Sequence, residues 1–208
     1  MKLRTKIFAT LPLMLLLGAC SEQPKPAAQT AAPAKTAEPI TALSAVYKMY
    51  TQARAWSPDC KVLRVASLSI PEVKNAAGKA GAWEAIFVSE SAQRARRYTF
   101  SVLESPGANL HEGVFGGSVD SWSGSHQNTP FLIQAFKTDS TVAYETALKN
   151  KGTEYAAKHP ELAVLFILEQ TSRFPDPAWR VVWGESVSTS GFSVFIDAMT
   201  GDFLQTSK

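Results

Sequence analysis

The segment Ala178–Leu204 alternates apolar and polar residues with a period of two, and this pattern of half-buried β-strands most constrains the fold. It predicts one strand around Trp179–Trp183, a second around Phe192–Asp197 and a turn at Thr200–Asp202. An earlier segment, Ala82–Val102, repeats the alternation and begins with the same Ala-Trp pair. Strands of this kind predict an antiparallel sheet with one buried face and one solvated face.

A helix is predicted before each group of strands. The first follows the capping residue Thr41, and the second opens at Asp139 and ends before Pro160. Trp83 follows the first cap by 42 residues, and Trp179 follows the second cap by 40. This matched spacing predicts two tandem units in an α+β fold, in which each helix packs on a three- to four-stranded antiparallel sheet.

The first twenty residues have the order of an export signal. A positive segment, Met1–Lys6, precedes an apolar run of 11 residues, Ile7–Leu17, which is too short to span a bilayer. The run ends in Leu17-Gly18-Ala19-Cys20, which resembles the lipobox of bacterial lipoproteins. The resemblance implies cleavage between Ala19 and Cys20 and a membrane anchor of acyl chains, such as palmitate, on Cys20. In Gram-negative lipoproteins of this kind, a residue other than Asp after the cysteine, here Ser21, implies transport to the outer membrane.

Residues 21–39, which precede the predicted units, differ from them in composition. This linker is rich in Ala and Pro and has no bulky apolar side chain, so it is expected to be an extended tether. The predicted organisation is a signal peptide over 1–19, the lipidated cysteine and linker over 20–39, a first unit over 40–128 and a second unit over 129–208.

The segment 139–204 resembles the PepSY domain. The resemblance depends on a helix that opens with Asp139-Ser140, a strand that contains Trp179-Arg180-Val181, and the segment Phe195–Asp202, which is similar to the family's V-D-A-x-T-G-E/D hairpin. The first unit keeps only the Ala82-Trp83 pair. The resemblance implies non-catalytic, PepSY-like modules that bind other envelope proteins or that inhibit or regulate peptidases. The tandem arrangement also resembles the architecture of a secreted β-lactamase inhibitor.

The charge of the chain argues against nucleic acid as a partner. The formal net charge of +3 comes from three basic residues in 1–19, and the rest of the chain carries 18 basic and 18 acidic residues. The one basic cluster, Arg94–Arg97, is interpreted as a solvated turn between two strands. A patch for phosphate or lipid headgroups is the alternative.

Candidate catalytic residues gather in the Gly/Ser-rich segment 109–128. His111, Glu112, Asp120 and His126 lie within 16 residues, but they match no metal-ligand or nucleophile motif. We interpret them as solvated loop residues, with a hydrolase that uses this loop as the alternative. Elsewhere, Cys60 is expected to be a small buried residue, and Asp197 is expected to accept hydrogen bonds from its own turn.

These observations predict a non-catalytic lipoprotein on the periplasmic face of the outer membrane that binds a protein partner of the envelope. A peptidase that it inhibits or regulates is the partner that the PepSY resemblance implies. A structural role in envelope assembly, without a single ligand, is the alternative. No catalytic residue, cofactor or metal ion is expected, and the sequence does not identify the residues that bind the partner.

Overall fold

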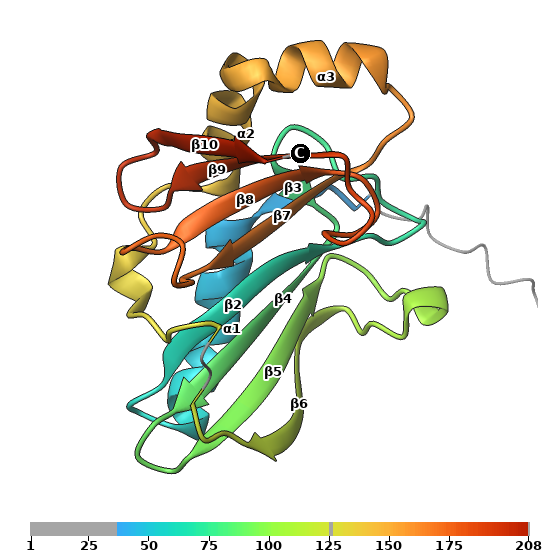
Figure 1. Cartoon of the computed structure of the whole chain (residues 1–208). Helices are drawn as coiled ribbons and strands as arrows, with labels where there is room; N and C mark the ends of the chain where they lie inside the picture. The colour runs from blue at the N-terminus through green and yellow to red at the C-terminus, as the bar shows by residue number, and fades with distance from the viewer. Residues whose placement is uncertain (1–36, 125–126, 208) are drawn as a thin grey trace, which may run out of the picture. The chain divides into compact units, whose positions relative to one another are not determined.

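The framework of the protein is an antiparallel sheet of eight strands (Figure 1). The computed structural model describes residues 37–124 and 127–207. The strand order is β10-β9-β8-β7-β2-β4-β5-β6. The strands are β2 Lys61–Leu68, β4 Ala82–Ser89, β5 Arg94–Ser101, β6 Gly113–Ser121, β7 Val164–Glu169, β8 Ala178–Trp183, β9 Phe192–Asp197 and β10 Phe203–Ser207. A short separate ladder joins β1 (Ile40–Thr41) to β3 (Lys79–Ala80).

Helices supply the second layer, and the predicted α+β class is confirmed in this coarse form. Helix α1 (Ala42–Trp56) lies behind β2, β4 and β5 in Figure 1. It begins where predicted, because the Thr41 hydroxyl caps it by accepting a hydrogen bond from the Ser44 N–H at 3.4 Å. Its buried residues, Ala42, Ala45, Val46, Met49 and Ala53, follow the spacing of one helix face.

The second predicted helix is interrupted, which corrects the expectation of one helix up to Pro160. Helix α2 covers Ser140–Ala147 and helix α3 covers Thr153–Lys158. Between them, Lys151 has a φ of 72° and the chain leaves helical geometry. Gly152 follows, and a Cβ on it would lie 2.7 Å from the Trp183 ring. The kink therefore brings the backbone against a core tryptophan, a contact that only glycine permits.

The strands that we divided between two units form one sheet, so the expectation of two separate sheets is wrong. Strand β7 pairs with β2 and joins the meander β2-β4-β5-β6 to the meander β7-β8-β9-β10. The core is also continuous: Phe166 of β7 contacts Trp83 of β4 and Tyr144 of α2, with ring centroids 6.3 and 6.0 Å apart. A period-two pattern specifies which face of a strand is buried and does not specify its neighbours.

Two local expectations also need correction. The segment 109–128, interpreted from the sequence as a Gly/Ser-rich loop, contributes the edge strand β6, which pairs with β5 through a bulge. The cluster Arg94–Arg97 lies inside β5 and not in a turn. Its residues therefore alternate between the two faces of the sheet: Arg97 contacts Glu84 at 2.9 Å, and Arg96 lies over the Tyr98 ring.

Trp83 and Trp179 occupy corresponding places in the two meanders. Both are fully buried. The Trp83 Nε1–H donates to the Ile40 carbonyl at 3.0 Å, and the Trp179 Nε1–H donates to the Thr138 carbonyl at 2.8 Å. Each carbonyl belongs to the residue just before a helix cap, so each tryptophan ties the start of a helix to the sheet.

The N-termini of α1 and α2 meet at Asp139. The Asp139 carboxylate accepts hydrogen bonds from the backbone N–H of Ser140 at 2.7 Å and of Leu43 at 3.0 Å. The Ser140 hydroxyl accepts from the Ala42 N–H at 2.9 Å. One carboxylate therefore caps its own helix and offsets the partial positive charge of both helix N-termini.

We expect Asp139→Ala to lower the free energy of unfolding by about 2 kcal/mol, because two N–H groups lose a charged acceptor. Asp139→Asn keeps an acceptor oxygen and loses the charge, so it is expected to cost about 1 kcal/mol or less. Urea denaturation of the three proteins measures both effects. A loss below about 0.5 kcal/mol for Asp139→Ala would contradict the joint cap.

Candidate functional site

The two meanders are hydrogen-bonded to each other only over a short stretch of β2 and β7. Strands β2 and β7 share three paired positions, Arg64 with Glu169, Val65 with Leu168 and Ala66 with Ile167. At the next position the Phe166 N–H donates to the Ser67 side-chain hydroxyl at 3.0 Å. Beyond it the ladder ends, and a cavity of about 430 Å³ opens between the diverging segments.

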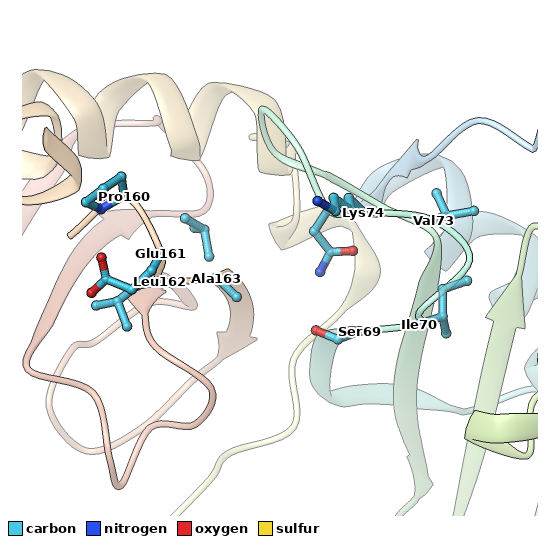
Figure 2. Close-up of a pocket in the computed structure, with 10 residues that line it drawn as sticks. Ser69, Ile70, Val73, Lys74, Pro160, Glu161, Leu162 and Ala163 are labelled. Carbon is cyan, nitrogen blue, oxygen red and sulfur yellow. The ribbon is translucent and has the colours of Figure 1, made fainter.

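We call this cavity the seam pocket. Figure 2 shows its two walls, one from the segment that follows β2 and the other from the segment that enters β7. The first wall is formed by Ser69, Ile70, Val73, Lys74 and Asn75, and the second by Pro160, Glu161, Leu162, Ala163 and Val164. Its volume falls in the range of sites that bind small molecules or short chain segments.

The first wall is held firmly. Ile70 and Val73 are bridged to each other and buried in a small apolar cluster. The chain then turns at Ala77 and Gly78, which both have positive φ, and two hydrogen bonds of 2.9 Å between Ala76 and Lys79 close the turn. A Cβ at Gly78 would lie 2.5 Å from the Thr141 Cα, so this turn packs directly on the first residues of α2. A ligand would therefore meet a preformed wall.

One polar side chain of the seam pocket, that of Asn75, lacks hydrogen-bond partners in the part of the chain that the structure describes. Both the Nδ2 and the Oδ1 of Asn75 are buried, and neither has a hydrogen-bond partner among the described residues. Buried amide groups are normally paired, and an unmade pair costs about 1–3 kcal/mol. The exposed Lys74 and Glu161 place opposite charges on the two walls. The pocket thus has a mixed apolar and polar lining, and one of its lining residues carries a buried donor and acceptor without partners in the described ranges.

The lining of the seam pocket holds few groups that carry covalent chemistry. Ser69 contributes a hydroxyl, and the ten lining residues include neither histidine nor cysteine. The nearest histidine in sequence, His159, lies at the end of α3, with its Nδ1 3.7 Å from Glu161 Oε1. In the described parts of the chain, no group of three or more His, Cys, Asp or Glu side chains could hold a metal ion.

The structure places His111 and Glu112 far from Asp120, another candidate residue of segment 109–128. His111 Nδ1 lies 2.8 Å from Glu104 Oε1, and the Glu112 N–H donates to the same carboxylate, which lowers the pKa of Glu104. Asp120 lies at the other end of β6, about 20 Å or more along the strand. His126 lies outside the described residues.

Two other predictions for single residues are confirmed. Cys60 is a buried free thiol, and burial raises its pKa. Asp197 accepts hydrogen bonds from the N–H groups of Met199 at 2.7 Å and Thr200 at 2.8 Å, as expected for its turn. The predicted cleavage and lipidation residues, Ala19 and Cys20, lie outside the described residues.

Asn75 and the seam pocket are not among the sites that the sequence predicts. Asn75 lies in a segment with Gly78 and Gly81, where asparagine is an ordinary turn residue. The segments 69–75 and 160–164 are far apart in the sequence, and no local pattern connects them. Within the described residues, no helix has both the length and the apolar character needed to cross a membrane.

Comparisons with known proteins add a fold relationship. Neither models of protein families nor curated protein sequences match this chain. Among solved structures, a protein from Clostridium difficile described as a "putative lipoprotein" is similar, with a TM-score of 0.50 and 10% sequence identity. The match covers 84% of this chain and 95% of that chain. At this identity the likeness shows the fold alone, a mixed α+β arrangement with a large antiparallel sheet.

Proposed function

We propose that this chain is a non-catalytic lipoprotein of the bacterial envelope that binds a segment of a protein partner in the seam pocket. The observation that carries the proposal is the Asn75 carboxamide: Asn75 lines the cavity, and its buried donor and acceptor have no hydrogen-bond partner among the described residues. The motif Leu17-Gly18-Ala19-Cys20 supports a lipid anchor, and Ser21 supports transport to the outer membrane.

An extended peptide is the ligand class that fits the seam pocket best. A carboxamide and a backbone peptide group each offer one N–H donor and one C=O acceptor, so Asn75 can pair with a peptide group through two hydrogen bonds. The apolar side chains of Ile70, Val73 and Leu162 can receive one or two side chains of the same segment. Lys74 and Glu161 then orient charged neighbours on opposite sides.

We further propose that the fold consists of two PepSY-like units placed side by side. The order of one helix region followed by four strands occurs twice, and Trp83 and Trp179 tie the two helix starts in the same way. The Asp197 hairpin supports the resemblance for the second unit. On this reading the partner segment binds where the two units join, and inhibition or regulation of a peptidase is the specific role that the resemblance implies.

Substitution of Asn75 is expected to change the affinity for the partner segment without lowering the free energy of unfolding. We expect Asn75→Leu to leave the free energy of unfolding unchanged or higher, because two buried polar atoms without partners are removed. The same variant should bind the partner segment about tenfold or more weakly, since both hydrogen bonds to the peptide group are lost. Gln52→Leu, which removes an exposed carboxamide from α1, is the matched control and should bind normally.

The measurement uses a photo-crosslinking amino acid at position 74 of the full-length protein in cells. A crosslinked segment, identified by mass spectrometry and synthesised as a peptide, is then titrated against the wild-type protein and both variants. Equal affinity for wild type and Asn75→Leu would contradict the proposed site. Loss of the cellular role in a His111→Ala, Asp120→Ala variant that still binds the peptide would instead favour the hydrolase. Normal cellular function of Asn75→Leu would favour a structural role in envelope assembly.

A further inference from the structure

A pair of arginines lies on the sheet face opposite the helices. Phe195 of β9 points to this face, because its neighbours Val194 and Ile196 belong to the core that the helices cover. The guanidinium carbon of Arg173 lies 4.5 Å from the centre of the Phe195 ring, and that of Arg180 lies 5.3 Å from it. Arg180 is the direct cross-strand partner of Phe195, and Arg173 reaches it from the loop between β7 and β8.

The other arginines on the central part of this face are neutralised. Arg64 and Arg97 both contact Glu84, at 3.5 and 2.9 Å, and Arg64 also lies 3.8 Å from Glu169. In contrast, neither Arg173 nor Arg180 makes an ion pair with any residue in 37–124 or 127–207. The two therefore leave an excess of positive charge at one end of the sheet.

The hydrogen bonds of the two guanidinium groups position them without neutralising them. Arg180 Nε donates to the Ser193 hydroxyl at 3.1 Å. Arg173 Nε donates to the side-chain oxygen of Gln205 at 3.1 Å when the Gln205 amide is oriented with its oxygen toward Arg173. Both acceptors are uncharged. Most of the donors on each guanidinium remain available, since an arginine carries five N–H groups.

Arg180 feels charges of both signs from its neighbours. Burial lowers its pKa, the Glu169 carboxylate raises it, and the positive charge of Arg173 lowers it. Two cations held beside one aromatic ring repel each other, and a bound anion would remove that repulsion. The Phe195 ring fixes both guanidinium groups in advance, so little side-chain entropy is lost when an anion binds.

We propose that Arg173 and Arg180 form a binding site for a phosphate group on the sheet face opposite the helices. The two positive charges match the charge of a phosphate monoester, about −2 at neutral pH. Its oxygens can accept paired hydrogen bonds from two planar guanidinium groups at once. A carboxylate carries one charge and two oxygens, and it satisfies one guanidinium. The site is independent of the seam pocket, because none of these residues lines that cavity.

Calorimetric titration of the full-length protein, solubilised in detergent and chloride buffer, tests the proposal. The probes are inorganic phosphate, glycerol phosphate as a free monoester, glycerophosphoglycerol as the soluble headgroup of an anionic lipid, and acetate. We expect saturable binding of phosphate and the monoester, and a loss of about tenfold or more in affinity for Arg173→Gln and for Arg180→Gln. Arg94→Gln, which removes an exposed arginine from β5, is the control and should bind as wild type does.

Each outcome decides the proposal. Binding of glycerophosphoglycerol at least as tight as that of the monoester would identify a lipid headgroup as the source of the phosphate, and weaker binding would identify a free phosphate or monoester. Equal affinity for acetate would overturn the choice of phosphate. Binding that survives in the double variant Arg173→Gln, Arg180→Gln, or no saturable binding to the folded wild-type protein, would overturn the site. Thermal melting confirms that each variant is folded.

Discussion

Replacing either Trp83 or Trp179 by alanine is expected to lower the free energy of unfolding by about 3–5 kcal/mol. Both indole rings are fully buried, and each contacts an aromatic ring: Trp83 contacts Phe166, and Trp179 contacts Phe136 with ring centroids 5.5 Å apart. Alanine would leave a cavity in the continuous core. It would also leave the carbonyl before each helix without its indole donor.

Replacement by phenylalanine separates these two contributions. Trp→Phe keeps most of the buried surface and removes the N–H, so each such variant is expected to lose about 1–2 kcal/mol from the unpaired carbonyl, in addition to a smaller packing loss. Phe115→Ala, at a ring that is 51% exposed on β6, is the control and should change stability by about 0.5 kcal/mol or less. Urea denaturation measures all five variants. Near-wild-type stability of both alanine variants would contradict the matched roles of the two tryptophans.

We expect Cys20→Ser to move the protein from the membrane fraction to the soluble fraction of cells. The lipobox resemblance assigns the anchor to acyl chains on this cysteine. Each buried CH₂ group of an acyl chain contributes about 0.8 kcal/mol to membrane binding, so two or three chains hold a protein stably and their loss releases it. Fractionation followed by immunoblotting measures the distribution, and mass spectrometry of the mature N-terminus detects the lipid.

The other cysteine provides the control for this experiment. Cys60 is buried in the core, so Cys60→Ser should remain in the membrane fraction if the variant folds. Ser21→Asp tests separately which membrane the protein reaches, because an aspartate after the lipidated cysteine is expected to retain the protein in the inner membrane. Membrane association of Cys20→Ser with processing still at residue 20 would refute the lipid anchor.

The sequence predicted features that depend on neighbouring residues. Thr41 and Asp139 were predicted as helix caps because Thr and Asp side chains accept hydrogen bonds from N–H groups close by in the chain. The strands around Trp83 and Trp179 were predicted because alternation places every second side chain on one face. The turn at Asp197 was predictable for the same reason as the helix caps, because the Asp197 carboxylate and the N–H groups that donate to it lie within three residues of each other.

Tertiary structure alone decided which distant segments meet. The sequence could not show that β7 pairs with β2, since the apolar pattern of each strand is equally compatible with other neighbours. The seam pocket, the orphaned Asn75 carboxamide and the flanking of Phe195 by Arg173 and Arg180 all depend on such long-range placement. The Asp139 contact with Leu43 also joins residues 96 positions apart. Local conformational preferences and the period of the apolar residues determine where helices and strands form and which of their faces are buried. Strand register, packing between elements and unpaired polar groups arise only when the elements assemble.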